Sequence, residues 1–194
     1  MAELWLVRHG ETTWNLTGQH TGRTDLPLTP RGAAQAKLLA RRLAGKVFAL
    51  VLTSPLLRAR ETCRLAGRLE EAKVEPDLAE WNYGALEGRT SAEIRAEMPG
   101  WTIWTGPWPQ GETPDEVGVR ADRAIARAIG AGGQVALFAH GHLLRILAAR
   151  WLGLPAVDGR YFALDPASLS VLGEERGERV VRSWNESSEL VESP

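Results

Sequence analysis

Cysteine is almost absent from this chain of 194 residues, because Cys63 is the only one. A single cysteine excludes a disulfide within the chain and favours a reducing compartment. No apolar run approaches the roughly 20 residues that a membrane-spanning helix needs. The first residues, Met1 to Trp5, lead directly into a strand pattern and lack the layout of a signal peptide. We therefore expect a cytoplasmic protein.

An excess of charge of one sign is also missing. The 23 Lys and Arg residues nearly balance the 24 Asp and Glu residues, and the net charge is −1. This balance gives no support to nucleic acid or an anionic membrane as a partner, so an anion site has to be a local cluster of cations. Those cations are mostly arginines, since the only lysines are Lys37, Lys46 and Lys73.

Internal repeats and low-complexity segments are absent as well, and the length suits one domain. We therefore predict a single domain over residues 1–194. Within it, the segment 81–112 reads as an irregular insertion on the substrate side, where Pro99, Pro107 and Pro109 oppose a regular helix and favour a fixed loop. The polar residues 186–194 are expected to form a loose tail.

Short apolar runs alternate with helix-start signals along the chain. The apolar runs predict buried strands at 4–7, 48–52, 134–139, 168–172 and 179–184. Threonine-proline pairs are typical of helix starts, because threonine caps the first turn and proline suits its first position. The expected helices run over 30–44, from Ser54-Pro55 onward, over 91–98, over 113–129, and after His142 to Trp151. This alternation predicts an α/β fold, a three-layer αβα sandwich around a largely parallel sheet.

Two histidines follow predicted strands directly, His9 after 4–7 and His140 after 134–139. In parallel α/β sheets, ligands bind beyond the carboxyl ends of the strands, so both residues stand where function is expected. Hydrolysis of a phosphate ester needs a nucleophile, cations for the phosphoryl oxygens and an acid for the leaving alcohol. A neutral imidazole can attack, and nearby guanidinium groups such as Arg8 and Arg58 lower its pKa. Arginine also grips two phosphate oxygens at once.

The segment Arg8-His9-Gly10-Glu11-Thr12 resembles the signature of the histidine phosphatase superfamily, in its phosphoglycerate-mutase-like branch. Four further blocks match in order: TGRTDLPLT at 21–29, SPLLRARET at 54–62, EWNYGALEG at 80–88 and AHGH at 139–142. Five ordered blocks between residue 4 and about residue 172 make this resemblance specific.

The resemblance implies that His9 becomes phosphorylated during the reaction. It also implies that Arg8, Arg58 and His140 bind the phosphoryl group and stabilise its developing charge. Glu80 would protonate the leaving group and then activate water. The remaining positions implied to line the phosphate and substrate pocket are Asn15, Thr21, Gly22, Tyr83 and Gly141. Because Glu80 must hold a proton for the first step, we predict a rate optimum on the acidic side.

The chain is most similar to the small acid phosphatases and sugar-bisphosphate phosphatases of this superfamily. Mutase relatives carry a longer insertion with a paired arginine and a lysine that hold a bisphosphorylated cofactor. Between Glu80 and Gly111 this chain has only Arg89 and Arg95, which are not adjacent. We therefore predict a phosphomonoesterase for small phosphorylated metabolites, with no cofactor and no metal. Phosphoglycerate mutase and a non-catalytic phospholigand-binding module stay open, as does the substrate.

Several residues carry more than one interpretation. Glu87 could replace Glu80 at the site, although the block pattern favours Glu80 and assigns Glu87 to the turn at Gly88. His140 and His142 could be a metal pair with Glu80 or Asp25, but residues two apart at a strand end point in opposite directions.

The other open residues are His142 itself, whose role varies among relatives, and His20, which has no claim beyond a loop. Trp101, Trp104 and Trp108 form either a core patch or a wall against the substrate. Cys63 is interpreted as buried filler. The apolar first strand leaves room for a homodimer.

Overall fold

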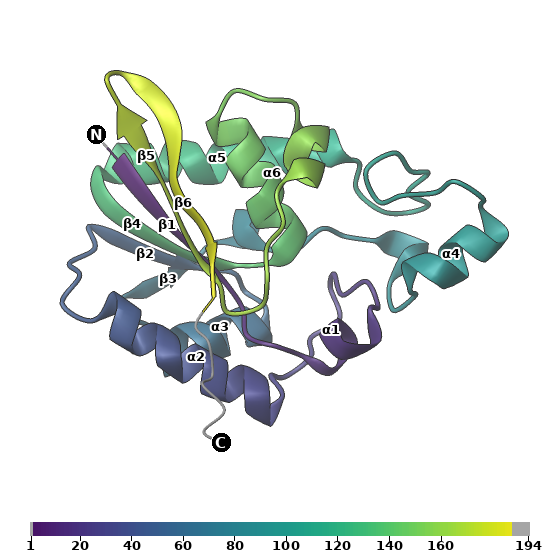
Figure 1. The fold of residues 1–194 in the computed structure, drawn as a ribbon, viewed down its shortest axis with the longest axis horizontal. Coiled ribbons are helices and arrows are strands. Elements are labelled where there is room, and N and C mark those ends of the chain that lie inside the picture. The colour runs from purple at the N-terminus through teal and green to yellow at the C-terminus, as the bar shows by residue number, and fades with distance from the viewer. Residues whose placement is uncertain (1, 188–194) are drawn as a thin grey trace.

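The computed structural model describes residues 2–187, and it contains a six-stranded sheet in the order β3-β2-β4-β1-β5-β6 (Figure 1). The four strands β3, β2, β4 and β1 pair in parallel, whereas β5 and β6 join one edge as an antiparallel hairpin. The strands are β1 (Ala2–Arg8), β2 (Leu50–Thr53), β3 (Ala72–Val74), β4 (Gly133–Ala139), β5 (Leu169–Glu175) and β6 (Glu178–Glu186). The predicted largely parallel sheet is confirmed.

Helices cover both faces of this sheet, with α2 and α3 on one side and α5 and α6 on the other (Figure 1). The helices are α1 (Thr13–Thr17), α2 (Pro30–Leu43), α3 (Leu57–Leu65), α4 (Ser91–Glu97), α5 (Pro114–Ala131) and α6 (Gly141–Trp151). Thr29 and Thr113 cap α2 and α5 through their side chains, as the threonine-proline pairs indicate. The three-layer αβα architecture is thereby confirmed.

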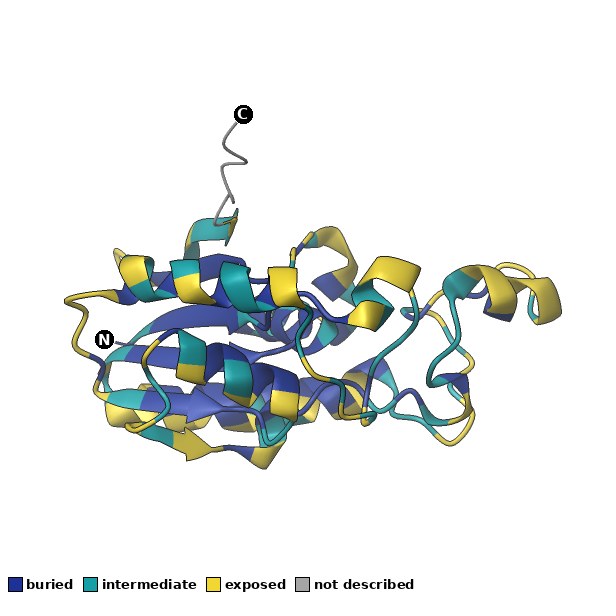
Figure 2. Cartoon of the chain, turned by 90° about the horizontal axis from the view of Figure 1, so that it is seen from below, coloured by how far each residue is buried: buried dark blue, intermediate teal, exposed yellow. Residues whose placement is uncertain are grey.

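The central strands are apolar throughout because both of their faces are covered. In β1, Leu4 and Leu6 join the core beneath α5 and α6, whereas Trp5 and Val7 join the core on the side of α2 and α3. Figure 2 shows these strands as a buried layer between half-exposed helices. Since β1 lies between β4 and β5, its apolar residues are used inside the chain and give no reason to expect a dimer. The homodimer stays a prediction without that support.

Several boundaries differ from the sequence prediction, and two of them have a clear physical reason. The second strand begins at Leu50 because Phe48 turns into the core and packs edge-on against Trp5, with ring centroids 5.8 Å apart. Helix α5 continues past Gly130 and ends at Ala131, because the next residue, Gly132, has a φ of 66° that breaks the helix. The short elements α1 and β3 carry too few residues for a periodic signal and were not predicted. Of the predicted tail 186–194, residue 186 ends β6, and residues 188–194 lie outside the described residues.

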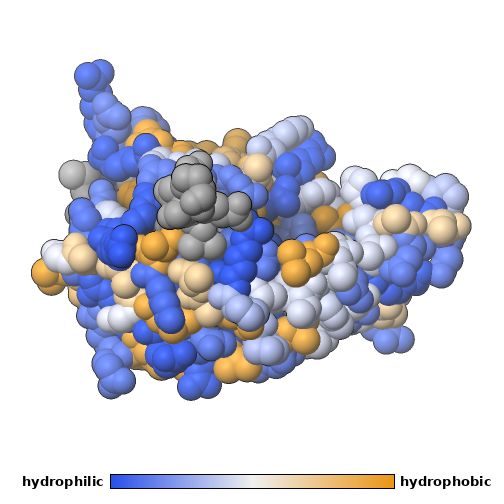
Figure 3. Space-filling model, turned by 60° about the horizontal axis from the view of Figure 1, so that its bottom comes forward, coloured by the Kyte–Doolittle hydropathy of each residue, from blue (hydrophilic) through white to orange (hydrophobic). Residues whose placement is uncertain are grey.

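Residues 75–112 leave the sheet and form the arm that carries α4 (Figure 1). This arm is irregular apart from α4 and two short 3-10 turns, Pro76–Leu78 and Gly84–Leu86, as expected for the 81–112 insertion. On the face shown in Figure 3, apolar residues are scattered between hydrophilic ones. Among residues 2–187, no helix is both long and apolar enough to cross a bilayer.

Candidate active site

The parallel pairing of β1 with β4 places the two strand-end histidines side by side. Arg8 pairs with Ala139 in the register, and the next amide, that of His9, donates to the Ala139 carbonyl at 3.0 Å. The imidazole rings of His9 and His140 then lie 5.2 Å apart. The strand-end argument made from the sequence therefore brings these two residues together as expected.

The imidazole of His9 is fixed in one tautomer. Its Nδ1 lies 2.7 Å from the carbonyl oxygen of Gly10, which can only accept, so Nδ1 carries the proton and Nε2 keeps its lone pair. Burial, and next the charges of Arg58 and Arg8, hold the pKa of His9 well below its ordinary value of 6.5. The ring is therefore neutral at neutral pH, with Nε2 available as a nucleophile.

Arg58 is fully buried behind His9 and makes four hydrogen bonds to protein atoms. Its Nε donates to Nδ1 of His140 at 3.1 Å, and its Nη atoms donate to the carbonyls of Thr21, Gly22 and Thr24 at 3.1, 2.9 and 2.9 Å. An arginine has five N–H groups, so one N–H of Arg58 has no partner among the described residues. Arg58 thus holds the 21–24 loop in addition to any direct contact with substrate.

His140 is held at both ring nitrogens. Because Arg58 can only donate, Nδ1 of His140 accepts, and its Nε2 carries the proton and donates to Oγ of Ser54 at 2.7 Å. Burial, followed by the charge of Arg58, keeps the pKa of His140 well below 6.5. The structure therefore places His140 next to His9 as a neutral support for Arg58.

The carboxylate of Glu87 holds the same loop from the other side. Its Oε1 accepts from the amides of Gly22 and Thr24 at 2.8 and 3.0 Å, and its Oε2 accepts from Arg23 at 3.3 Å. The assignment of Glu87 to the Gly88 turn is wrong, because the Gly88 amide donates to the His20 carbonyl instead. A Cβ at Gly22 would lie 2.4 Å from the Trp81 carbonyl, so this tight loop requires glycine there.

The side chain of Glu80, which comes from the arm, is buried against the first turn of α6. Its Oε1 accepts from the amides of Trp81 and Leu143 at 2.9 and 3.0 Å, and its Oε2 accepts from the amide of His142 at 3.1 Å. Two of these donors belong to the first turn of α6, where amides are otherwise unpaired. The carboxyl group is therefore oriented by backbone on three sides.

One buried donor of Arg8 is unpaired in the part of the chain that the structure describes. Its Nη1 donates to the Leu164 carbonyl, but its buried Nε has no hydrogen-bond partner among the described residues. The guanidinium packs on Gly141, where an added Cβ would lie 3.2 Å from Cζ of Arg8. A buried unpaired N–H beside His9 is costly unless a ligand accepts from it, which indicates an anion site.

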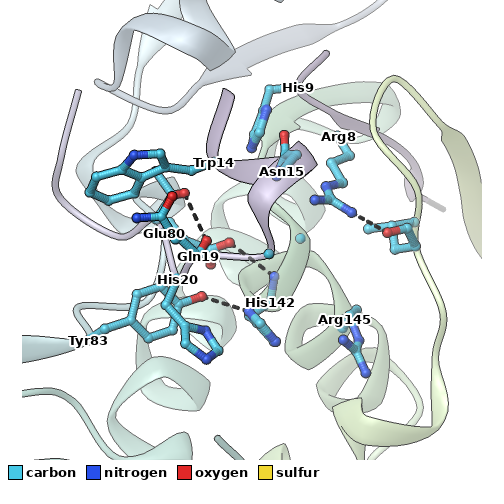
Figure 4. Close-up of a pocket in the computed structure, with 14 residues that line it drawn as sticks. Arg8, His9, Trp14, Asn15, Gln19, His20, Glu80, Tyr83, His142 and Arg145 are labelled. Atoms are coloured by element: carbon cyan, nitrogen blue, oxygen red, sulfur yellow. Dashed lines mark hydrogen bonds between the residues drawn. The ribbon is translucent and has the colours of Figure 1, made fainter. Parts of the chain in front are cut away.

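A cavity of ≈ 240 Å³ connects these groups, and Figure 4 shows His9 and Asn15 at one end and His20, Tyr83 and His142 at the other. Seven of the ten predicted site residues line it: Arg8, His9, Asn15, Thr21, Glu80, Tyr83 and Gly141. The other three, Gly22, Arg58 and His140, lie behind its wall and hold it in place. The amide oxygen of Asn15 accepts from the Thr12 amide at 2.9 Å, which fixes the start of α1.

The cavity also has lining residues that were not predicted from the sequence: Trp14, Gly18, Gln19, His20, His142, Arg145 and Leu164. His20 lies in a loop as expected, yet its ring packs at a tilt against Tyr83, with ring centroids 4.9 Å apart, and its Nε2 lies 3.2 Å from Oγ of Ser91. For His142, its place in the AHGH block was a reason to consider it as a site residue. Nothing local distinguishes Gln19 or Arg145 from solvated residues.

Tyr83, which is buried, and His142, which is half-buried, form a pair in the cavity wall. The Tyr83 hydroxyl lies 2.6 Å from Nδ1 of His142. Burial raises the pKa of Tyr83 well above its ordinary value of 10.0 and lowers the pKa of His142 well below 6.5. Both groups are therefore neutral and can serve as hydrogen-bonding partners for uncharged groups.

The tryptophans of the arm divide between the two interpretations. Trp101 is buried and its Nε1 donates to the Pro107 carbonyl, as expected of a core patch. Trp104 packs edge-on against His142 at 5.3 Å and so supports the cavity wall from behind. Trp108 donates to the Ile103 carbonyl and closes the arm on itself. None of the three lines the cavity directly.

Within residues 2–187, no group of three or more His, Cys, Asp or Glu side chains is arranged to hold a metal ion. His140 precedes α6 and His142 lies in its first turn. The ring nitrogens of His140 are engaged by Arg58 and Ser54, which opposes a metal pair with His142. Metal-independent chemistry stays a prediction that a chelator tests.

The chain is similar to known proteins in both sequence and fold. The family model of the histidine phosphatase superfamily (branch 1) matches residues 4–187. An acid phosphatase of Mycobacterium tuberculosis is 41% identical over 181 residues, covering 91% of this chain and 88% of that protein. Sedoheptulose 1,7-bisphosphatase of Saccharomyces cerevisiae is 39% identical over 186 residues, covering 77% of this chain and 67% of that protein. The solved structure of a Mycobacterium tuberculosis open reading frame has a TM-score of 0.91 at 38% identity, covering 96% and 98% of the two chains.

Proposed function

The chain belongs to the histidine phosphatase superfamily (branch 1), and we propose that it hydrolyses small phosphate monoesters through a phosphohistidine on His9. One observation carries this proposal. His9, whose Nε2 keeps its lone pair, and Arg8, whose Nε–H has no partner among the described residues, both line the same cavity. The first group suits attack on phosphorus, and the second suits a phosphoryl oxygen.

In the first step, Nε2 of His9 attacks phosphorus while the bond from phosphorus to the ester oxygen breaks. Glu80 gives its proton to that oxygen, so the alcohol leaves neutral. Nδ1 keeps its proton and donates it to the Gly10 carbonyl in a hydrogen bond, which stabilises the positive charge of the phosphorylated ring. Arg8 binds the phosphoryl oxygens from the cavity, and the charge of Arg58 acts from behind.

In the second step, the Glu80 carboxylate takes a proton from water as the water oxygen bonds to phosphorus. The bond between phosphorus and Nε2 breaks, and its electron pair returns to His9. Inorganic phosphate leaves, and Glu80 ends the cycle protonated. The backbone amides of Trp81, His142 and Leu143 donate to the carboxyl group of Glu80 and keep it oriented through both steps.

The relatives support the proposed chemistry without fixing the substrate. One is named an acid phosphatase and another a sedoheptulose 1,7-bisphosphatase, so both act on phosphate esters by name. The proposed substrate class for this chain is a small phosphorylated metabolite, in keeping with a cavity of ≈ 240 Å³.

A labelling experiment tests the phosphohistidine. Enzyme mixed with ³²P-labelled substrate and quenched in acid or alkali should carry label that is acid-labile and alkali-stable, and His9→Ala should carry none. Hydrolysis of p-nitrophenyl phosphate should disappear in the same variant. Full activity in His9→Ala, with no label on the wild type, would overturn the proposal.

The two alternatives predict different results in the same assays. A phospholigand-binding module would bind phosphate esters without releasing phosphate from p-nitrophenyl phosphate. A mutase would need a bisphosphorylated primer and would transfer the label to a second substrate molecule instead of water. Activity that persists in EDTA is expected of the proposed chemistry.

A further inference from the structure

Arg120 of α5 is a largely buried arginine that does not line the cavity, and its side chain is only 11% exposed. Its Nε and Nη2 donate to the two carboxylate oxygens of Glu112 at 2.7 and 2.9 Å, which makes a bidentate ion pair. Its Nη1 donates to the carbonyls of Asp77 and Ala79 at 2.9 Å each, and its Nη2 also donates to the Glu80 carbonyl at 3.4 Å. All five N–H groups of this arginine therefore have protein partners.

Glu112 holds the chain on the other side of Glu80. Its Oε2 accepts from the amide of Asn82 at 2.8 Å, and its own amide donates to the Asn82 carbonyl at 2.9 Å. Its carbonyl accepts from Nε1 of Trp81 at 2.7 Å. The amide of Trp81 is in turn one of the three donors to the Glu80 carboxyl group. Glu112 thus fixes the backbone that follows Glu80 together with one of its donors.

The segment that carries Glu80 depends on these contacts because it has no regular structure of its own. Residues 79–83 connect the 3-10 turns Pro76–Leu78 and Gly84–Leu86 and belong to no helix or strand. Their backbone groups therefore need partners other than a regular hydrogen-bond ladder. Arg120 supplies donors to the carbonyls of Ala79 and Glu80, and Glu112 pairs with the next residues.

Two helices on one face of the sheet thus share the placement of Glu80 (Figure 1). Helix α6 binds its carboxyl group through the amides of His142 and Leu143, and α5 holds its backbone through Arg120. A general acid must lie within hydrogen-bond reach of the atom that it protonates, and an error of about 1 Å can cost about 100-fold in rate. The contacts to α6 orient the carboxyl group, but its distance from the substrate also depends on where the backbone lies.

We propose that Arg120, paired with Glu112, is a positioning residue for Glu80 and sets the distance from the Glu80 carboxyl group to the ester oxygen. This inference rests on the proposed function, since it takes Glu80 as the proton donor. Arg120 acts on protonation of the leaving group and leaves binding of the phosphoryl group unchanged, because Arg8 and His9 come from β1 and the residue after it.

A pair of esters that differ in their leaving group tests this role. Phenyl phosphate and p-nitrophenyl phosphate share the same ring and phosphate, but phenol needs a proton to leave far more than p-nitrophenol does. In a reaction with a covalent intermediate, kcat/KM reports only the steps up to release of the alcohol, so it isolates the first step. Loss of Arg120 should lower kcat/KM for phenyl phosphate about ten-fold further than for p-nitrophenyl phosphate.

The variants are chosen so that the fold survives. A buried ion pair is best removed as a whole, because one partner left alone is an unpaired buried charge. The first variant is therefore the double substitution Arg120→Met with Glu112→Gln, in which glutamine keeps an oxygen for the Asn82 amide. Arg120→Lys keeps the charge without the bidentate geometry and should show the same selective loss to a smaller extent. Arg123→Gln is the matched control, since Arg123 also lies on α5 but pairs with Asp77 with its side chain 55% exposed, and it should keep the wild-type ratio of the two esters.

The ratio of the two esters separates positioning from a merely structural role. A structural role would lower the fraction of active enzyme and so reduce kcat/KM for both esters equally. Equal losses in the double variant and in Arg120→Lys would overturn the inference. Circular dichroism at the assay temperature shows which variants are folded, and Arg120→Lys decides the question if the double variant is not.

Glu80→Gln distinguishes this failure from failure of the proposed function. It should lose activity on phenyl phosphate selectively, and to a greater extent than the Arg120 variants. If Glu80→Gln loses both esters equally, Glu80 is not the acid, and the proposed mechanism fails together with the inference. If Glu80→Gln is selective and the Arg120 variants are not, the inference alone fails.

Discussion

Replacing Glu87 with glutamine tests whether a residue outside the cavity holds the 21–24 loop. The carboxylate accepts from three consecutive amides, those of Gly22, Arg23 and Thr24. Glutamine is nearly the same size and keeps one carbonyl oxygen, which can serve the two amides now on Oε1. It loses the negative charge and the acceptor for the Arg23 amide. Glu87→Gln therefore removes about one charge-assisted hydrogen bond and leaves the packing unchanged.

The expected cost follows from that loss. A hydrogen bond to a charged group contributes about 1.5–3 kcal/mol. For a chain of this size, each kcal/mol shifts the melting temperature by about 2–4 °C, so Tm should fall by about 3–12 °C. The loop carbonyls of Gly22 and Thr24 also hold Arg58, so we expect kcat/KM for p-nitrophenyl phosphate to fall by about ten-fold as Arg58 loosens.

Thermal unfolding and steady-state kinetics measure both effects. Glu97→Gln is the matched control, because Glu97 pairs with Arg89 at the surface and its side chain is 65% exposed. Surface ion pairs contribute about 1 kcal/mol or less, so this control should stay close to wild type. If Glu87→Gln melts and turns over like Glu97→Gln, the loop is held by other contacts and the reasoning fails.

Three further predictions concern protonation and reactivity. Glu80→Gln should slow alkyl phosphate hydrolysis by at least about 100-fold, yet release the first p-nitrophenol in a burst, because that leaving group needs little protonation; equal loss on both substrates in stopped-flow assays would remove Glu80 as the acid. The folded pKa values of His9 and His140 lie below 6.5, so the unfolded chain binds more protons there, and stability should fall as pH drops below 6.5, by up to about 1.4 kcal/mol per pH unit for each group. Urea midpoints that stay constant from pH 6.5 to 5.5 would contradict this. Burial raises the pKa of Cys63 to about 12, so a thiol reagent at pH 8 should label it only after unfolding; rapid labelling of the native protein would show that it is accessible.

The parts of the site that follow strands were accessible to sequence reasoning. His9 and His140 each end a buried apolar run, and in a parallel sheet such ends meet at one edge, which the pairing of Arg8 with Ala139 confirms. The Ser54-Pro55 signal likewise located α3 closely enough to place Arg58 near the same edge. These predictions hold because the apolar pattern records which segments form buried strands, and the carboxyl ends of parallel strands lie at one edge of the sheet.

Other parts depend on contacts between distant segments, and no local pattern records those. Glu80 and Glu87 lie in one block, yet one meets the first turn of α6 and the other meets the 22–24 loop. The sequence also could not show that Arg58 lies behind the cavity wall, since a motif gives the residue type and not the side it faces. Arg145 had no signal at all, because its significance comes from the cavity that it lines.

The reactivity of His9 and its effect on stability have the same physical origin. A nucleophilic imidazole must stay neutral, and here burial together with the charges of Arg58 and Arg8 keeps it neutral well below pH 6.5. The same interactions oppose protonation of the folded protein, so every proton that the unfolded chain gains in acid shifts the equilibrium towards unfolding. The first step of the proposed mechanism, however, needs a proton on Glu80, so we expect acid to favour it. Acidification should therefore raise the rate until the neutral histidines destabilise the fold, and the acid limit of activity should follow the loss of structure more closely than protonation of His9.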